Sequence, residues 1–226
     1  MITYSEFVSV VTTGLIDPVN GNITGNTVVM FGDSFTYGTG AFLPGKRFST
    51  WLCEDKGWTE DNKGVGGECM IKYAPNPFTS MQDRLAEIPT KTADLRYLFI
   101  AYGLNDIGLN FDGWTVDLLE TQFMVVINNA INKGWKKNNI IISGTYYVAT
   151  TFWDQYSAYG VTSIADNVRY QLFRQKVLSF STYATIVDPY QWVIDNGGDA
   201  LMNGVGGHPG NLGHQKIGEY FIANLK

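Results

Sequence analysis

The sequence predicts an α/β fold in which helices cover both faces of a parallel β-sheet. Short apolar runs rich in β-branched residues alternate along the chain with longer stretches that carry apolar residues at helical spacing, a pattern typical of this class. The 226 residues are 45% hydrophobic, which is enough to bury one substantial core. Because no shift of composition marks a linker, we expect a single domain over residues 1–226.

The elements follow from these runs in chain order. We expect a short strand leading into Gly64 and four further strands, over 27–31, 97–102, 139–144 and 184–187. Helical spacing predicts helices over 47–55, 79–87, 116–133, 164–180 and about 211–223. Gly and Asn are frequent in two expected loops, 15–26 and 195–211. Residues 2–11 fit either an edge strand or a short helix, and we expect 1–26 to form an N-terminal extension packed on the domain.

Charge and composition exclude several classes of function. The formal net charge of -5 gives no basic surface for phosphates, so we expect no nucleic-acid partner. No apolar run approaches the ~20 residues of a membrane-spanning helix, so we expect no membrane partner. The N-terminus lacks the basic and apolar regions of a signal peptide, which leaves a cytoplasmic protein or part of a larger secreted or phage-type assembly. Cys53 and Cys69 lack the spacing of a zinc site, and we expect reduced structural thiols with neither metal nor cofactor.

A serine follows directly on the first strong strand, in the segment VVMFGDSFTYGTG. Ser34 therefore lies at the carboxyl end of a strand, the edge at which open α/β sheets bind ligands. Gly32 allows the chain to turn sharply there and to present the hydroxyl group. Asp and Ser are also ordinary turn residues, so this segment alone leaves both a nucleophile and a simple turn open.

Two further segments place hydrogen-bond donors at the same edge. In NKGVGGECM, three glycines follow the short strand, and their backbone N–H groups can approach a reacting oxygen or serve a tight turn; they are Gly64, Gly66 and Gly67. In LFIAYGLNDIG, Asn105 follows the strand 97–102, where its side chain can donate to an oxyanion or cap the next helix. Taken singly, neither segment separates the two interpretations.

Both histidines of the chain lie in GVGGHPGNLGH, near the C-terminus. His208 stands in a Gly-rich loop before Pro209 and a helix, the kind of junction that holds a general base facing a cleft. His214 lies inside that helix, and we expect it to be structural.

Taken together, these four segments resemble the SGNH (GDSL-like) hydrolase family, whose motif blocks occur in this order along nearly the whole chain. The resemblance implies a flavodoxin-like, three-layer α/β/α sandwich with a central parallel sheet. It implies that Ser34 is the nucleophile and His208 its base. It also implies an oxyanion hole made by the backbone N–H groups of Ser34 and Gly67 and the side chain of Asn105. The chain contains no GxSxG segment, which argues against the other large esterase fold.

One position departs from the family pattern. Val205 stands three residues before His208, where the family usually has an aspartate that orients the imidazole. In the alternative that we favour, a main-chain carbonyl of segment 204–207 accepts from the ring, which gives a Ser–His dyad. In the other, a nearby carboxylate takes the place of the missing one, and the candidates are Asp188, Asp195 and Asp199.

These assignments predict a serine esterase that transfers the acyl group of a short-chain ester to water. A carbohydrate O-acetyl ester is favoured because an aromatic-rich segment follows the strand 139–144 and should border the same edge. The rings of this segment could equally pack under a long loop. They are Tyr146, Tyr147, Trp153, Tyr156 and Tyr159. The enzymatic alternative is a lipase or lysophospholipase. The non-catalytic alternative is a glycan-binding module on a degenerate scaffold. The oligomeric state stays open.

Overall fold

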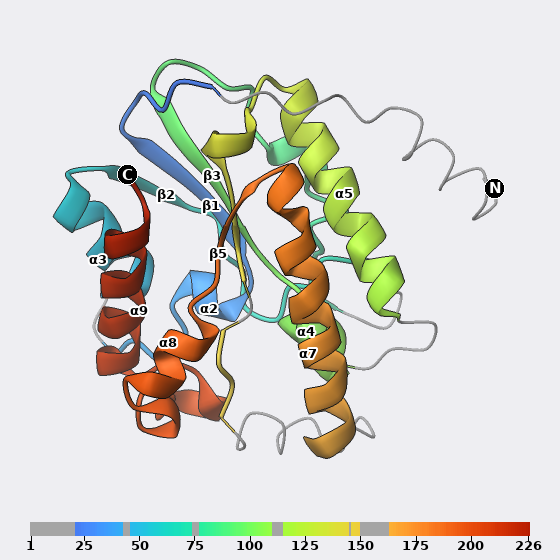
Figure 1. The fold of residues 1–226 in the computed structure, drawn as a ribbon, viewed down its shortest axis with the longest axis vertical. Coiled ribbons are helices and arrows are strands. Elements are labelled where there is room, and N and C mark those ends of the chain that lie inside the picture. The colour runs from blue at the N-terminus through green and yellow to red at the C-terminus, as the bar shows by residue number, and fades with distance from the viewer. Residues whose placement is uncertain (1–20, 43–45, 74–76, 110–114, 145, 150–162) are drawn as a thin grey trace.

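A parallel sheet of five strands forms the centre of the computed structural model, which describes residues 21–42, 46–73, 77–109, 115–144, 146–149 and 163–226 (Figure 1). The strands are β1 (Thr27–Gly32), β2 (Thr59–Asn62), β3 (Leu95–Ala101), β4 (Ile140–Ser143) and β5 (Thr185–Val187). They lie in the order β2-β1-β3-β4-β5, and every neighbouring pair is parallel. This is the order of flavodoxin-like doubly wound sheets, which confirms the predicted fold class.

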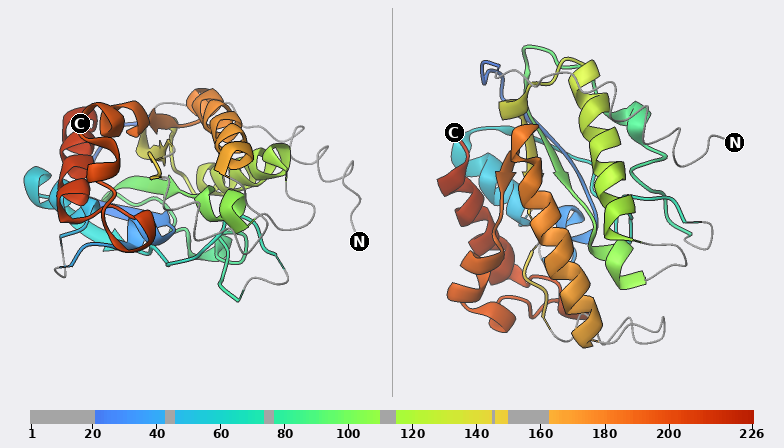
Figure 2. Two further views of the ribbon diagram at one scale, coloured as in Figure 1. Left: turned by 90° about the horizontal axis from the view of Figure 1, so that it is seen from below. Right: turned by 45° about the vertical axis from the view of Figure 1, so that its right-hand side comes forward.

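Helices cover both faces of the sheet and complete three layers (Figure 1; Figure 2). On one face α3 (Phe48–Lys56) packs against α9 (Asn211–Asn224), and on the other α5 (Val116–Asn132) packs against α7 (Ser163–Ser179). The chain leaves β1 toward β2 but leaves β3 in the opposite direction, toward β4 and β5. Since such crossovers are right-handed, the two directions place their helices on opposite faces.

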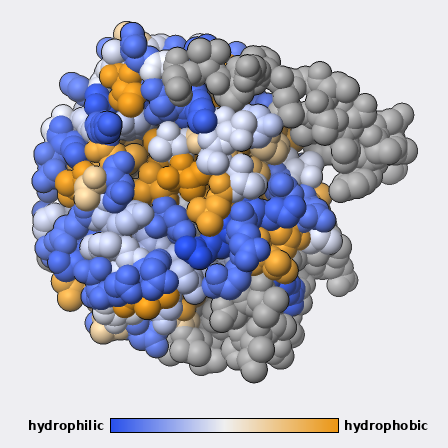
Figure 3. Space-filling model, viewed as in Figure 1, coloured by the Kyte–Doolittle hydropathy of each residue, from blue (hydrophilic) through white to orange (hydrophobic). Residues whose placement is uncertain are grey.

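The core forms because the three central strands are apolar on both sides, as parallel strands covered by helices must be. Aromatic rings fill both helix–sheet interfaces. Phe48, Phe99 and Phe221 meet on the α3–α9 face with ring centroids 5.3–5.9 Å apart. On the α5–α7 face, Phe123 lies 5.7 Å from Phe173. The face seen in Figure 3 is largely hydrophilic, with a group of apolar residues near its centre.

Three short helices were not expected from the sequence. α2 (Ser34–Tyr37) and α4 (Leu104–Leu109) follow β1 and β3 directly, and α8 (Tyr190–Asp195) follows β5. Their four to six residues are too few to show a helical period. α2 and α4 lie at the lower end of the sheet in Figure 1, which is the carboxyl edge of the strands.

The predicted helix over 79–87 is wrong. The segment forms turns and only a 3₁₀ turn at Leu85–Glu87. Several of its backbone N–H groups donate outside the segment's own helical ladder. Met81 N donates to Cys69 O of the preceding loop at 2.9 Å, and Asp83 N donates to the side chain of Ser80 at 3.2 Å. Serine and aspartate compete in this way with helical hydrogen bonds, so apolar spacing alone was misleading.

The predicted N-terminal strand or helix over 2–11 lies outside the described residues. The last part of the expected extension, from residue 21, contacts the domain: Gly21 N donates to Asn138 Oδ1 at 2.8 Å and Asn26 N donates to Asp94 O at 3.0 Å. That the whole chain forms one domain stays a prediction.

Candidate active site

Ser34 lies at the point where β1 turns into α2. Asp33 caps this helix, because its Oδ1 accepts from Phe35 N at 2.9 Å. Only glycine fits at position 32, since a Cβ there would come 2.0 Å from Thr36 Oγ1. The tight turn places Ser34 at the carboxyl edge, beside the β1–β3 pair where the strand order reverses.

His208 reaches the hydroxyl of Ser34 from the opposite end of the chain. Its Nε2 lies 2.7 Å from Ser34 Oγ, and its Nδ1 lies 2.7 Å from Val205 O. Because a carbonyl oxygen only accepts, Nδ1 carries the ring hydrogen and Nε2 accepts from the serine hydroxyl. This is the tautomer that a general base needs. The ring also packs against Phe35, with centroids 5.2 Å apart.

The loop before His208 brings the Val205 carbonyl back to the ring. Gly206 and Gly207 have φ of 62° and 74°, a region that side chains disfavour, and Gly204 N closes the loop by donating to His208 O at 2.8 Å. The contact with a carbonyl of segment 204–207 is the one that the dyad alternative expects. The side chain of Val205 takes no part in it and is 68% exposed.

The three carboxylates proposed for this place have other partners. Asp188 pairs with Arg174 at 2.7 Å, Asp199 accepts from Tyr147 Oη at 2.7 Å, and Asp195 accepts from the side chain of its neighbour Gln191. Burial lowers the pKa of His208, and the bond to the Val205 carbonyl partly opposes this effect. Among the described residues, therefore, no carboxylate is seen to stabilise a protonated imidazole.

The loop after β2 brings Gly67 beside the end of β1. Val65 N donates to Gly32 O at 2.9 Å, and Gly64 packs so closely on α2 that a Cβ would come 2.4 Å from Tyr37 N. Gly67 has φ of 78°, and within the described residues its N–H donates to no protein acceptor. As the first helical residue, Ser34 has no acceptor for its N–H within α2.

Asn105 is buried in the first turn of α4. Its Nδ2 donates to Glu68 O at 2.9 Å, which ties the side chain to the residue that follows Gly67. An amide nitrogen carries two hydrogens, and this bond uses one of them and restrains the orientation of the group. The structure thus brings together at one edge all four residues predicted for the site: Ser34, Gly67, Asn105 and His208.

Two buried carboxyl groups that the sequence analysis left without a role organise this edge. Asp106 accepts from Met70 N at 2.8 Å and from Ile71 N at 3.0 Å, which binds the Gly67 loop to α4. Burial raises the pKa of Asp106, like that of Asp33, to about 7, and hydrogen bonds from backbone N–H groups oppose the effect. The only sequence signal for Asp106 was its place beside Asn105. The second of the two groups is Glu68, which no sequence signal marked.

His214 has the structural role expected for it. Its Nδ1 accepts from Phe48 N at 3.3 Å and its Nε2 donates to Thr39 O at 3.1 Å, so the ring joins α9 to α3. Burial lowers its pKa to about 4, which keeps it neutral.

The aromatic segment after β4 is only partly described. Tyr146 is buried and stacks on Phe35 with centroids 4.8 Å apart, so its ring packs in the core rather than facing a ligand. Tyr147 is partly exposed and holds Asp199. The other three rings of the segment, Trp153, Tyr156 and Tyr159, lie outside the described residues.

A cavity of about 420 Å³ borders the His208 loop. It is lined by Ala149, Asp199, Met202, Asn203, Gly204, Gly206 and Gly207. In the parts of the chain that the structure describes, no cluster of three metal-ligating side chains occurs, and no helix has the length and apolar character to span a bilayer.

Comparison with known families gives one match. The sequence model of the GDSL-like lipase/acylhydrolase family matches residues 30–216, which include all four site residues. No curated protein sequence matches the chain.

Solved structures share the fold at low sequence identity. The native aryl esterase of M. smegmatis is 14% identical with a TM-score of 0.68, covering 88% of this chain and 98% of its own. A carbohydrate acetylesterase from Sinorhizobium meliloti is 12% identical with a TM-score of 0.67, covering 88% and 98%. A catalytic mutant of an acetylxylan esterase from Geobacillus stearothermophilus is 17% identical with a TM-score of 0.57, covering 89% and 94%. At such identities these likenesses show the fold alone.

The partner of His208 can be tested by replacing each candidate carboxylate. We expect Asp188→Asn, Asp195→Asn and Asp199→Asn each to keep kcat within about tenfold of wild type, since loss of a triad carboxylate costs on the order of ten-thousandfold. The measurement is turnover of a chromogenic acetate ester at neutral pH. Thermal unfolding must show that each variant folds, above all Asp188→Asn, which loses its ion pair with Arg174. A ten-thousandfold loss in one folded variant would identify that residue as a third triad member.

If His208 is the base, its lowered pKa predicts the position of the acid limb of the activity profile. Only the neutral imidazole accepts the serine proton, so kcat/KM falls as the pH falls through the pKa of His208. We expect the midpoint of this limb to lie below 6.5, the ordinary value. The measurement is kcat/KM for a neutral acetate ester across the acidic and neutral range, with His214→Asn as control because burial lowers the pKa of His214 to about 4. A midpoint above 6.5 would mean that a carboxylate does stabilise the imidazolium.

Proposed function

Because the chain belongs to the GDSL-like lipase/acylhydrolase family, we propose that it is a serine esterase that removes a short acyl group, an O-acetyl group of a carbohydrate, from its substrate. The observation that carries this proposal is the 2.7 Å contact between His208 Nε2 and Ser34 Oγ, with Nδ1 held at 2.7 Å by Val205 O. A hydroxyl group with an oriented base beside it is the arrangement of an activated nucleophile.

The reaction proceeds in two acyl transfers. Ser34 Oγ attacks the ester carbonyl while His208 Nε2 takes its proton, and the imidazolium then returns this proton to the departing alkoxide. The resulting acyl-serine is attacked by water, which His208 deprotonates in the same way, and the acid leaves as Ser34 regains its proton. The oxyanion formed in each step is stabilised by the N–H groups of Ser34 and Gly67 and by Asn105 Nδ2.

The Val205 carbonyl does part of the work of a triad carboxylate. It fixes the tautomer and the orientation of the ring, since it accepts from Nδ1 at 2.7 Å. It offers a dipole instead of a full charge, so it stabilises the imidazolium less. The proposed enzyme is therefore a dyad whose base has the right geometry.

A short acyl group agrees with the surroundings of Gly67. The ring of Phe78 packs against this residue, so near that a Cβ at position 67 would come 2.7 Å from the ring. This ring is 52% exposed, so it offers an apolar surface close to the proposed oxyanion donor Gly67.

A carbohydrate alcohol agrees with the cavity beside the His208 loop. The alkoxide leaves on the side of His208, because this residue protonates it. The cavity is lined by the loop before His208 and not by Ser34 or His208, and it offers the carboxylate of Asp199, the amide of Asn203 and glycine backbone groups, which suit the hydroxyl groups of a sugar. Support also comes from the names of two structural neighbours, an acetylxylan esterase and a carbohydrate acetylesterase.

The first experiment measures hydrolysis of p-nitrophenyl acetate and octanoate by the wild type and by Ser34→Ala. We expect the acetate to be cleaved faster, and Ser34→Ala to lose activity by about 10⁴-fold or more while remaining folded, because the covalent step is lost. Asn105→Ala should lower kcat about a hundredfold with little change in KM. Faster cleavage of octanoate would favour a lipase. A wild type that binds glycans but cleaves neither ester would favour the non-catalytic module.

The cavity residues give a test of the carbohydrate assignment. We expect Asp199→Ala and Asn203→Ala each to raise KM for an acetylated sugar about fivefold, the effect of one lost hydrogen bond. KM for p-nitrophenyl acetate, which has no sugar, should stay unchanged. Asp195→Ala is the matched control, because Asp195 is exposed nearby on α8 and does not line the cavity. Equal effects of the cavity variants on both substrates would remove the cavity from sugar recognition.

A further inference from the structure

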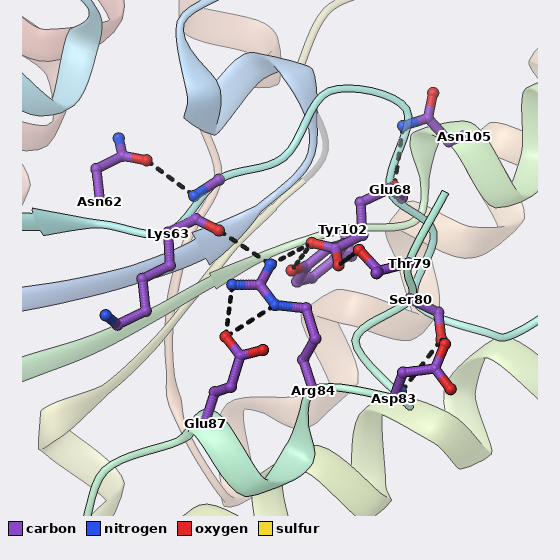
Figure 4. A network of polar contacts seen from close by, with 11 residues as sticks. Asn62, Lys63, Glu68, Thr79, Ser80, Asp83, Arg84, Glu87, Tyr102 and Asn105 are labelled. Atoms are coloured by element: carbon purple, nitrogen blue, oxygen red, sulfur yellow. Dashed lines mark hydrogen bonds and ion pairs between the residues drawn. The ribbon is translucent and has the colours of Figure 1, made fainter. Parts of the chain in front are cut away.

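A buried carboxylate, Glu68, follows Gly67 in the chain and lies beside Asn105, so it adjoins two of the three proposed oxyanion donors (Figure 4). Its side chain is fully buried, and three side chains donate to it. Arg84 Nη1 lies 2.7 Å from Oε2, Tyr102 Oη donates to the same oxygen at 2.7 Å, and Thr79 Oγ1 donates to Oε1 at 2.9 Å. No step of the proposed reaction uses this group.

The main chain of Glu68 connects two of the proposed donors, Gly67 and Asn105. The residue follows Gly67 directly in the chain, and its carbonyl oxygen accepts from Asn105 Nδ2 at 2.9 Å. A displacement of Glu68 is therefore transmitted to Gly67, its neighbour in the chain, and to the Asn105 side chain that donates to its carbonyl oxygen. Two side chains hold Glu68 in place against such a displacement. Tyr102, directly after β3, and Arg84, directly before Leu85, both bind its carboxylate.

Arg84 is itself fixed on several sides. Its Nη1 also donates to Lys63 O at 3.0 Å, in the loop that leads to Gly67, and its guanidinium lies over the Phe31 ring of β1 at 5.2 Å from the centroid. Glu87 accepts from Arg84 Nη2 at 2.9 Å. One guanidinium thus links the loop before the glycines, the carboxylate after them and the strand that leads to Ser34.

Stability alone does not account for this pair. Glu68 is fully buried and Arg84 is only 11% exposed, and the desolvation of such a pair offsets much of its Coulombic attraction. A buried ion pair whose polar atoms are all hydrogen-bonded holds its neighbours in one arrangement. Here the neighbours are Gly67 and Asn105, two of the proposed oxyanion donors.

We propose that Glu68, held by Arg84, is a positioning residue that fixes the Gly67 N–H and the Asn105 side chain relative to each other and so preorganises the oxyanion hole. The inference rests on the esterase function proposed above. Donors that are already aimed need no rearrangement as the charge develops, so their loss of alignment lowers kcat more than it changes KM.

The main variant is Glu68→Gln, which keeps the shape of the side chain and loses its charge. We expect kcat for p-nitrophenyl acetate to fall about tenfold or more, with KM within about threefold, as for weakened oxyanion stabilisation. Glu87→Gln is the matched control, since it removes the other carboxylate on Arg84 without touching Glu68. Its kcat should stay within about twofold of wild type, as for an exposed ion pair.

Coupling to Asn105 separates positioning from a general structural effect. If Glu68 acts through the oxyanion donors, Glu68→Gln should cost less than about threefold in kcat when Asn105 is already alanine, because effects on one unit are not additive. Glu68→Gln combined with Arg84→Met removes both charges and should recover unfolding stability but not kcat, because no unpaired charge is left buried. Unchanged kcat in Glu68→Gln, or additive losses in the Asn105→Ala background, would overturn the proposal.

A measurement without substrate tests the positioning role of Glu68 independently of the proposed esterase function. In ¹H–¹⁵N spectra of the full chain, we expect Glu68→Gln to shift the Gly67 amide and the Asn105 side-chain amide signals, and Glu87→Gln to leave them in place. If the wild type hydrolyses no ester, the proposed function fails, while these signals still report on positioning. Signals unmoved by Glu68→Gln would refute the positioning role even in an active esterase.

Discussion

The pairing of β1 with β3 is the constraint on which the candidate active site at the carboxyl edge depends. Its register sets Gly32 opposite Ala101, so the two strands end at the same level and their following helices begin there. Both strands are buried among apolar side chains, and a slip by one residue would turn every side chain to the wrong face. Ser34 and Asn105 follow within a few residues of these ends, so the placement of the two residues comes from the sheet.

The sequence was sufficient for features with a local signature and insufficient for those made by contacts distant in the chain. Continuous apolar runs predicted β1, β3 and β4, and the strand-end segments predicted that Ser34, Gly67 and Asn105 would meet at one edge. His208 was predicted from its Gly-rich loop before a helix and from the family resemblance. The helix over 79–87 failed because Ser80 and the preceding loop compete for its backbone groups. The network around Glu68 could not be predicted, since its donors are 11 to 34 residues away and belong to different elements.

The carboxyl groups around this edge organise it at some expense of stability. Asp33 and Asp106 bind backbone N–H groups, yet burial raises the pKa of both to about 7 from 3.8. The folded state therefore holds protons that the unfolded chain has released, and the contribution of these groups to stability falls as the pH rises through that interval. Such groups serve by fixing the loop of Gly67 and the start of α2 rather than by stabilising the fold.

Val205 contacts His208 through its main-chain carbonyl, while its side chain is exposed, so the contact does not depend on the residue type at position 205. The partner of the His208 imidazole is a peptide carbonyl, and every amino acid carries one. What selects that carbonyl is the left-handed backbone at Gly206 and Gly207, where a larger residue would be strained. The orientation of the His208 ring thus depends on two glycines that have no side chain to contact His208 or Ser34. Position 205 itself is open to substitution without loss of the carbonyl partner.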